Sequence, residues 1–123
     1  MNKKKLKVAV VGLGKMGILH SCILNTIPDV QLTAVCDKSR VTRRFLKKIF
    51  DETRMVDDVE KLSDWNLDAI YITTPIPSHF PVAKTIYSYK IACNLFVEKT
   101  LAKTCVEAQE LCKIAHSSGG VNM

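Results

Sequence analysis

Three glycines with the spacing GxGxxG limit the fold of this chain more than any other feature. Gly12, Gly14 and Gly17 follow the apolar run Val8 to Val11 and precede a segment of helical character. In a turn between a buried strand and a helix, glycines allow a tight bend, close approach of a phosphate and close packing of the helix on the strand. The amides at the beginning of that helix then face the phosphate. The pattern predicts a dinucleotide site.

A carboxylate follows at the distance that this interpretation requires. Asp37 comes about 20 residues after Gly17, directly after a second apolar run from Leu32 to Cys36. A carboxylate there accepts hydrogen bonds from the hydroxyls of the adenosine ribose, and its charge repels a 2′-phosphate. We therefore predict NAD as the cofactor. Lys38 and Arg40 are close enough in sequence to soften the exclusion, which leaves NADP as a second option.

Strand-like and helix-like segments alternate along the whole chain. The predicted strands are 8–11, 31–36, 54–56, 67–73 and 93–97, and the predicted helices begin at 15, 39, 57, 78 and 104. Parallel strands joined by right-handed helical crossovers form a doubly wound sheet with ligands at the carboxyl ends of its strands. The sequence therefore predicts an α/β, Rossmann-type doubly wound parallel sheet in a single domain, residues 1–123.

The predicted helices carry recognisable periodic patterns. Met16, Leu19 and Ile23 share a stripe of the first helix, in which His20 is interpreted as a structural histidine. Another stripe identifies an amphipathic helix from residue 39 to about 50; it consists of Val41, Phe45 and Ile49, widened by Leu46 and Phe50. Asp57 with Glu60, and Thr104 with Glu107, have the form of capping boxes.

Composition excludes several other classes of protein. The chain has 123 residues, of which 47% are hydrophobic and 24% charged, and it contains no apolar stretch as long as a membrane span, about 20 residues. We expect a cytoplasmic protein without membrane association. The five cysteines are odd in number and lack metal-ligand spacing, which favours buried free thiols over disulfides or a metal site.

The net charge of +6 does not by itself indicate nucleic acid. The basic residues gather mainly at 3–7 and 40–48, where a solvated terminus and a solvated helix face account for them. Basic and aromatic residues do not interleave as they do in RNA-binding proteins. We therefore expect a nicotinamide dinucleotide as partner, and no nucleic acid.

Four motifs in order resemble one family of oxidoreductases. They are VGLGKMG from Val11, AVCD from Ala34, TPIPSH from Thr74 and VEKTLA from Val97. Together they resemble the amino-terminal half of the glucose-fructose oxidoreductase, inositol dehydrogenase and rhizopine-catabolism family (Gfo/Idh/MocA). The resemblance implies hydride transfer between NAD or NADP and a sugar, polyol or related carbonyl compound.

The resemblance also assigns roles along the predicted rim of the sheet. The glycine turn would meet the pyrophosphate, Asp37 the ribose, the Thr74 segment the nicotinamide half, and Glu98 with Lys99 would form the family's EKP motif. The residues expected at the cofactor are Gly12, Gly14, Lys15, Met16, Gly17, Asp37, Lys38, Arg40, Thr73, Thr74, Pro75, His79, Glu98 and Lys99.

Lys99 is the expected catalytic residue. Removing hydride from an alcohol also requires removal of the hydroxyl proton, and a lysine beside an oxidised nicotinamide can accept it. The alternative is a surface lysine paired with a nearby carboxylate. Thr100 stands where the family motif has proline, which removes a restraint on the backbone of Lys99.

The family pattern extends beyond the last residue, Met123. We expect a substrate domain, with further catalytic groups and the oligomer interface, in the full-length protein, so that this chain alone binds cofactor and turns over little. A non-catalytic dinucleotide sensor or scaffold is the alternative. The substrate itself is not predicted, because its contacts belong to the second domain.

Overall fold

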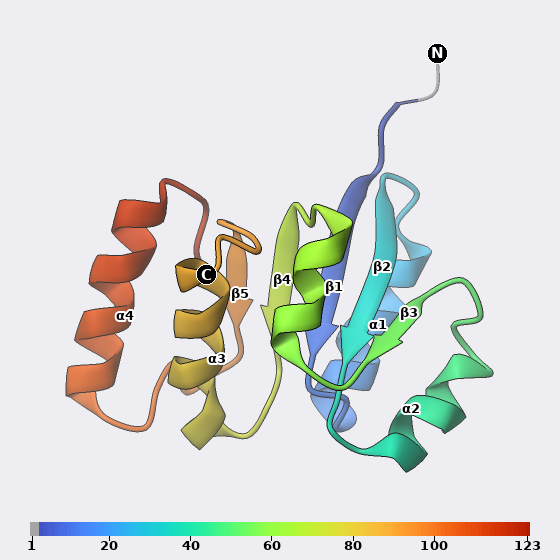
Figure 1. Cartoon of the computed structure of the whole chain (residues 1–123), viewed down its shortest axis with the longest axis horizontal. Coiled ribbons are helices and arrows are strands. Elements are labelled where there is room, and N and C mark those ends of the chain that lie inside the picture. Colours follow the sequence, from blue (N-terminus) through green and yellow to red (C-terminus); the bar gives the residue numbers. More distant parts are fainter. Residues whose placement is uncertain (1–2) are drawn as a thin grey trace.

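Five short apolar strands pair in parallel to form one sheet in the order β3-β2-β1-β4-β5 (Figure 1). The computed structural model describes residues 3–123, so the first two residues of the predicted domain lie outside it. The strands are β1 Leu6–Val11, β2 Val30–Cys36, β3 Arg54–Val56, β4 Ala69–Ile72 and β5 Leu95–Val97. The carboxyl ends of all five strands point to the same edge, the lower one in Figure 1. The predicted doubly wound parallel sheet is confirmed.

Helices cover both faces of the sheet, because alternate residues of the central strand β1 are apolar on both sides. The helical elements are α1 Lys15–Thr26, α2 Arg40–Lys47, the 3₁₀ helix η1 Val59–Trp65, α3 Ile76–Ser88 and α4 Cys105–Ser118. Val8 and Val10 pack with Leu24 of α1 and Leu46 of α2. Ala9 and Val11 belong to the core on the opposite face, which includes residues of η1, α3 and α4.

The apolar stripes that identified the first two helices face outward, contrary to the usual orientation. In α2, Val41 is 79% and Phe45 61% exposed, whereas Leu46 is completely buried. In α1, Met16, Leu19 and Ile23 are exposed, and the helix packs instead through Gly17, Ser21 and Leu24. A helix that lies close to a strand requires small side chains at the contact. The prediction from large apolar residues therefore missed the buried face of this helix.

Several predicted element ends shift in the structure. α2 ends at Lys47 instead of about residue 50, and β4 and β5 are each shorter than their apolar runs. α3 begins at Ile76, two residues before the predicted start, because a proline in the first helical turn needs no hydrogen bond for its nitrogen.

Side-chain caps also decide where two helices begin. The predicted cap of η1 was one residue off: Asp58 accepts the hydrogen bond from Glu60 N–H, and Asp57 pairs with Lys61. Thr104 caps α4 as predicted, by accepting from Glu107 N–H at 3.2 Å.

The end of the chain lies beside β5. After α4 the backbone turns at Gly119, whose φ of +74° is in the left-handed region. Asn122 then forms a parallel bridge with Leu95, and Met123 accepts a hydrogen bond from Val97 N–H at 2.8 Å. The last residues thus begin to pair with β5 as a further parallel strand.

The cysteines depart from the prediction of buried thiols. All five are free, but Cys36 at the end of β2 is the single buried one among the described residues. Burial raises the pKa of the Cys36 thiol to about 12. Cys22, Cys93, Cys105 and Cys112 are exposed. In residues 3–123 no group of histidine, cysteine and acidic side chains could hold a metal ion, and no helix is long and apolar enough to cross a membrane.

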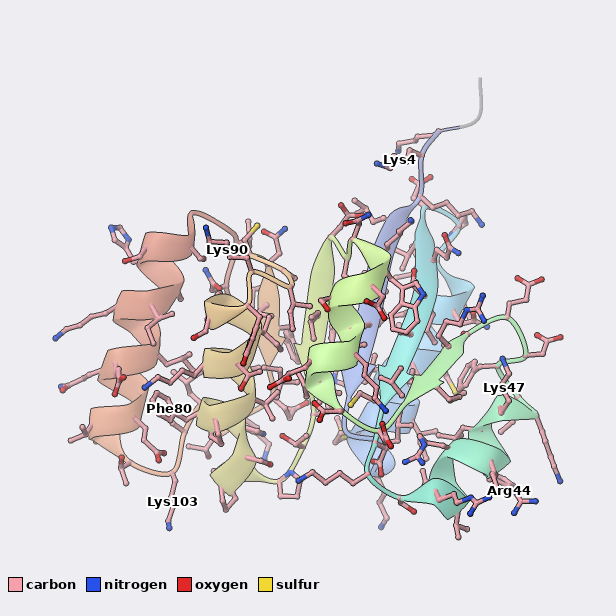
Figure 2. All side chains as sticks on the ribbon, in the orientation of Figure 1. Lys4, Arg44, Lys47, Phe80, Lys90 and Lys103 are labelled. Carbon is pink, nitrogen blue, oxygen red and sulfur yellow. The ribbon has the colours of Figure 1, made fainter. Side chains whose placement is uncertain are left out.

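The positive charge is spread over different sides of the molecule. Figure 2 labels Lys4 near the amino terminus, Lys90 after α3 and Lys103 before α4, all at a distance from Arg44 and Lys47 on α2. Arg44 and Lys47 line a hollow of about 370 Å³ beside β3, together with Arg40, Arg43 and Met55. The +6 net charge therefore does not form one continuous basic face.

Candidate functional site

A cavity of about 860 Å³ opens at the carboxyl ends of the strands, where the fold places a ligand. Many of the predicted cofactor residues line it: Gly12, Gly14, Lys15, Met16, Asp37, Lys38, Thr73, Thr74 and Pro75. They come from three separate loops, after β1, β2 and β4. The parallel arrangement of these strands is what brings the loops together.

The glycine turn between β1 and α1 is tightly built at two of its three positions. Gly12 has a φ of +93°, and a Cβ there would lie 2.7 Å from Thr74 N. A Cβ on Gly17 would lie 1.7 Å from the carbonyl oxygen of Gly12. Neighbouring backbone atoms thus leave no room for a side chain at these two positions. This agrees with the prediction of a tight turn at Gly12 and close packing of the helix on the strand at Gly17.

Gly14 is different, because a Cβ on it would meet no atom of residues 3–123 within 4 Å. It precedes the first turn of α1, has no side-chain cap, and is followed by a turn without acidic residues. The first amides of α1 thus lack a side-chain acceptor at the wall of the cavity, where an anion would be favoured. The protein itself gives no reason for a glycine here, whereas a phosphate lying against the backbone does.

Asp37 connects the glycine turn to the end of β2. Its Oδ2 accepts from Leu13 N–H at 2.8 Å, and its Oδ1 accepts from Ser39 N–H at 2.8 Å. Each carboxylate oxygen has a second lone pair for a further donor. Asp37 therefore has a structural role that sequence reasoning did not anticipate, and it still offers acceptors toward the cavity that it lines.

Arg43 was also not anticipated. Its guanidinium donates to the backbone carbonyl of Asp37 at 2.6 Å and to that of Lys38 at 2.9 Å. The side chain crosses back from α2 to the loop that carries the carboxylate. It thereby fixes the loop in which Asp37 lies. A basic residue six positions after the carboxylate gives no recognisable signal in sequence.

Two threonines define the other end of the cavity. Thr73 Oγ1 donates within the turn, lying 2.7 Å from the carbonyl oxygen of Gly12. Thr74 Oγ1 is buried and has no hydrogen-bond partner among the described residues. A buried hydroxyl without a partner is uncommon in folded proteins. Thr74 lines the cavity, so this hydroxyl belongs to a residue of the cavity wall.

The remaining predicted site residues do not line the cavity. Gly17 lies behind the turn, and Arg40 lines the basic hollow beside β3. His79 is buried, at 1% exposure, and its two ring nitrogens face backbone carbonyls. Glu98 and Lys99 follow β5, and the Lys99 ammonium has no carboxylate within ion-pair distance among residues 3–123.

Glu98 is held by a histidine from α1. His20 Nε2 lies 3.1 Å from Glu98 Oε2, and the other carboxylate oxygen accepts from Lys99 N–H at 3.0 Å. The hydrogen bond from His20, and next that from Lys99 N–H, lower the pKa of the Glu98 carboxyl. His20 thus has a specific partner close to the predicted catalytic residue.

Sequence reasoning also missed part of the cavity wall. Residues after β3 and on the outer turns of α3 contribute to it, namely Asp57, Asp58, Val59, Glu60, Ser78, Pro81, Val82 and Thr85. The loop after β3 could have been found from topology alone, because every strand of a parallel sheet ends at the same rim. The α3 residues carry no comparable signal.

The residues present fit a dinucleotide. The open space above Gly14, the first amides of α1, the acceptors of Asp37 and the unpartnered Thr74 hydroxyl match a pyrophosphate, a ribose and a polar nicotinamide end in that order.

The sequence model of the Gfo/Idh/MocA group, described as an oxidoreductase family with an NAD-binding Rossmann fold, matches residues 6–123. The chain belongs to this family. It is therefore an NAD-binding Rossmann domain of the Gfo/Idh/MocA oxidoreductases, and the cofactor class predicted from the glycine turn and Asp37 is confirmed.

Individual relatives agree with the family assignment. Myo-inositol 2-dehydrogenase of Thermotoga maritima is 27% identical over 107 residues, which cover 86% of this chain and 31% of the relative. Scyllo-inositol 2-dehydrogenase (NAD(+)) of Bacillus subtilis is 29% identical over 108 residues, covering 85% and 31%. The chain thus spans about a third of the length of these curated relatives.

A solved structure of the same fold contains the cofactor. GenD2 from gentamicin A biosynthesis, in complex with NAD, is 28% identical and superimposes with a TM-score of 0.85, covering 99% of this chain and 35% of that one. The similarity extends over the whole sheet and its helices.

Proposed function

We propose that this chain is the cofactor-binding domain of a dehydrogenase that transfers hydride between NAD and a sugar, polyol or related carbonyl compound. The observation that carries the proposal is the cavity at the strand ends, where Gly14 leaves the backbone open and Thr74 Oγ1 has no hydrogen-bond partner within residues 3–123. The inositol dehydrogenases among the relatives support the substrate class.

Each loop of the cavity has a separate task in this proposal. The first amides of α1, with Lys15 beside them, hold the pyrophosphate. Asp37 accepts from the ribose hydroxyls through the lone pairs that Leu13 and Ser39 leave free. Thr73, Thr74 and Pro75 form the wall at the nicotinamide half.

Lys99 handles the proton. The bound nicotinamide supplies a hydride acceptor or donor, while the Lys99 amine takes the hydroxyl proton from an alcohol or donates a hydrogen bond to a carbonyl. The contacts to the substrate belong to a second domain of the full-length protein, which is also where we place its oligomer interface. The chain alone should therefore bind cofactor and show little turnover. An in-frame continuation of the gene that encodes an acid/base pair would support a two-domain dehydrogenase. Its absence from the gene would favour the alternative function, a non-catalytic dinucleotide sensor.

Calorimetric titration of the folded chain with NADH and NADPH, at one moderate salt concentration, tests the proposal. We expect saturable binding of both with NADH favoured. A folded chain that binds neither at about millimolar concentration would refute it.

Asp37→Ala should narrow the preference for NADH over NADPH by about fivefold or more, because it removes the charge that repels the 2′-phosphate. The substitution also removes the acceptor for Leu13 N–H and Ser39 N–H, so the affinity for both cofactors should fall. The ratio of the two dissociation constants separates the effects, since loss of loop order weakens both alike. An unchanged ratio of the dissociation constants would mean that Asp37 does not contact the adenosine ribose.

A further inference from the structure

We propose that His20 and His79 are positioning residues that hold the segment Glu98–Thr100 from two sides and so direct Lys99 toward the nicotinamide end of the cavity. The inference rests on the proposed function, because that function gives Lys99 its role. Neither histidine is among the residues that line the cavity, and each reaches the segment from a different helix.

The first contact comes from α1. The His20 ring packs beside Tyr71 of β4 and Phe96 of β5, with ring centroids 5.6 Å and 5.2 Å away. Held there, Nε2 lies 3.1 Å from Glu98 Oε2, while Glu98 Oε1 accepts from Lys99 N–H at 3.0 Å. The carboxylate therefore links the histidine to the backbone of the lysine.

The second contact comes from α3. His79 Nδ1 lies 2.8 Å from the carbonyl oxygen of Thr100, and Nε2 lies 2.7 Å from that of Thr74. A carbonyl oxygen only accepts, so the ring is the donor in each bond that it forms. A single buried ring thus lies between the residue after Lys99 and a residue of the cavity wall. A ring with one N–H donates to one of the two carbonyls, and a ring protonated at both nitrogens donates to both.

Together the two histidines hold the segment on both sides of Lys99, through the Glu98 side chain that accepts from Lys99 N–H and through the Thr100 carbonyl, which belongs to the Thr100–Leu101 peptide. Its own side chain is exposed and has no ion pair within residues 3–123. The direction of the lysine therefore depends on its backbone. Thr100 lacks the ring that a proline would provide at that position, and the bond from His79 to the Thr100 carbonyl supplies a restraint there.

Comparison of NADH with ADP-ribose separates positioning from general stability. Both ligands contain the adenosine and pyrophosphate, but ADP-ribose lacks the nicotinamide. Loss of the histidine contacts should weaken binding of NADH and leave the binding of ADP-ribose unchanged. A general loss of structure would weaken both.

His20→Gln and His20→Asn form a matched pair. The glutamine amide can reach the position of Nε2 and donate to Glu98, whereas the asparagine amide is too short. We expect His20→Asn to weaken NADH binding by about fivefold, the value of one lost hydrogen bond, and His20→Gln to bind nearly as wild type. Equal affinities of the two variants for NADH would overturn the proposal.

The two contacts of His79 can be separated by the same pair of substitutions. His79→Asn keeps a donor near Nδ1, facing Thr100, and His79→Gln keeps one near Nε2, facing Thr74. We expect His79→Gln, which loses the donor to Thr100, to weaken NADH binding by about fivefold relative to wild type, and His79→Asn, which keeps it, to weaken binding less. His79 is buried, so its variants can fail to fold. In that case the two His20 variants decide the test.

Amide hydrogen exchange at Lys99 gives a test that needs no cofactor. By NMR, exchange of the Lys99 amide should be faster in His20→Asn than in wild type and restored in His20→Gln. If wild type binds neither NADH nor ADP-ribose, the proposed function fails. Faster exchange of the Lys99 amide in His20→Asn would then still support the contact of His20 with Glu98. An unchanged exchange rate in His20→Asn, or an equal loss of NADH and ADP-ribose binding, would overturn the inference.

Discussion

The three glycines of the first turn have three different reasons to be glycine. Gly12 has a backbone conformation that other residues rarely adopt, and Gly17 lies against the carbonyl of Gly12. Gly14 has neither restriction. In the sequence the three positions look equivalent, but the neighbours of each residue separate what folding requires from what a ligand requires.

Gly14→Ala should leave the free energy of unfolding within about 0.5 kcal/mol of wild type, because its Cβ meets no protein atom. Its affinity for NADH should fall at least about tenfold, since the methyl group occupies the approach of the pyrophosphate. Urea unfolding and calorimetry measure the two quantities.

Gly17→Ala is the control for that substitution. Its Cβ would overlap the carbonyl of Gly12, so the turn or α1 must shift, at a cost of about 1–3 kcal/mol in stability. If Gly14→Ala lost as much stability as Gly17→Ala, Gly14 would be a folding glycine and the argument for a phosphate at this position would fail.

The pH dependence of the Glu98 contact follows from its pKa. The carboxyl has a pKa below its ordinary value of 4.5 because of the bonds from His20 and Lys99 N–H. A lowered pKa in the folded state means that the contribution to stability is present above the ordinary pKa and is lost as the pH falls through the folded value. The difference in urea midpoint between wild type and Glu98→Gln should be present at about pH 6 and shrink below about pH 4. A difference that stays constant through acid would exclude a stabilising charge on Glu98.

At the scale of the element, α2 shows that periodicity finds a helix more reliably than it finds the buried face. Val41, Phe45 and Ile49 recur every four residues and are exposed, while Leu46 packs with Val10 and Val35. Ser39 begins the helix by accepting from Thr42 N–H at 3.2 Å. The register of the helix on the sheet is set by where β2 ends and by this cap, and not by the longest apolar stripe.

Adjacent residues of α2 provide a test of this orientation. Leu46→Ala should lower the free energy of unfolding by about 2–5 kcal/mol, because it leaves a cavity in the core. Phe45→Ala, next to it, should change the stability by less than about 0.5 kcal/mol. Urea unfolding of the two variants measures both. A larger loss for Phe45→Ala would place the apolar stripe against the sheet after all.

At the scale of the whole molecule, the cavity is built from residues that lie far apart in sequence. Its wall extends from the turn after β1 to α3, through the loops after β2 and β3. A ligand that fills it contacts loops which are otherwise joined mainly through the sheet. Cofactor binding should therefore stabilise the fold as one unit.

Saturating NADH should raise the free energy of unfolding by about 2.7 kcal/mol at 100 times the dissociation constant. The physical reason is that the ligand binds the folded chain and not the unfolded one. Urea unfolding monitored by Trp65 fluorescence, with and without NADH, measures the effect. Gly14→Ala is the matched control and should show a smaller shift at the same NADH concentration. An equal shift in both would indicate binding away from the glycine turn.

Much of this protein could be predicted from local sequence. The glycine spacing, Asp37 and the alternation of strands and helices predicted the sheet, the rim and the class of cofactor, because turn chemistry and strand burial depend on residues close in sequence. The β3 segment matched its predicted bounds, and Thr104 caps α4 as expected.

The tertiary structure alone decided which groups meet across the rim. The pairing of His20 with Glu98 and the bridging of Thr74 and Thr100 by His79 join residues of different helices and loops. The same holds for the outward faces of α1 and α2 and for the hydroxyl of Thr74, which has no partner in the described part of the chain. A hydrogen bond needs its two atoms within about 3 Å and correctly aligned, and between distant segments that geometry exists only after the sheet has brought them together.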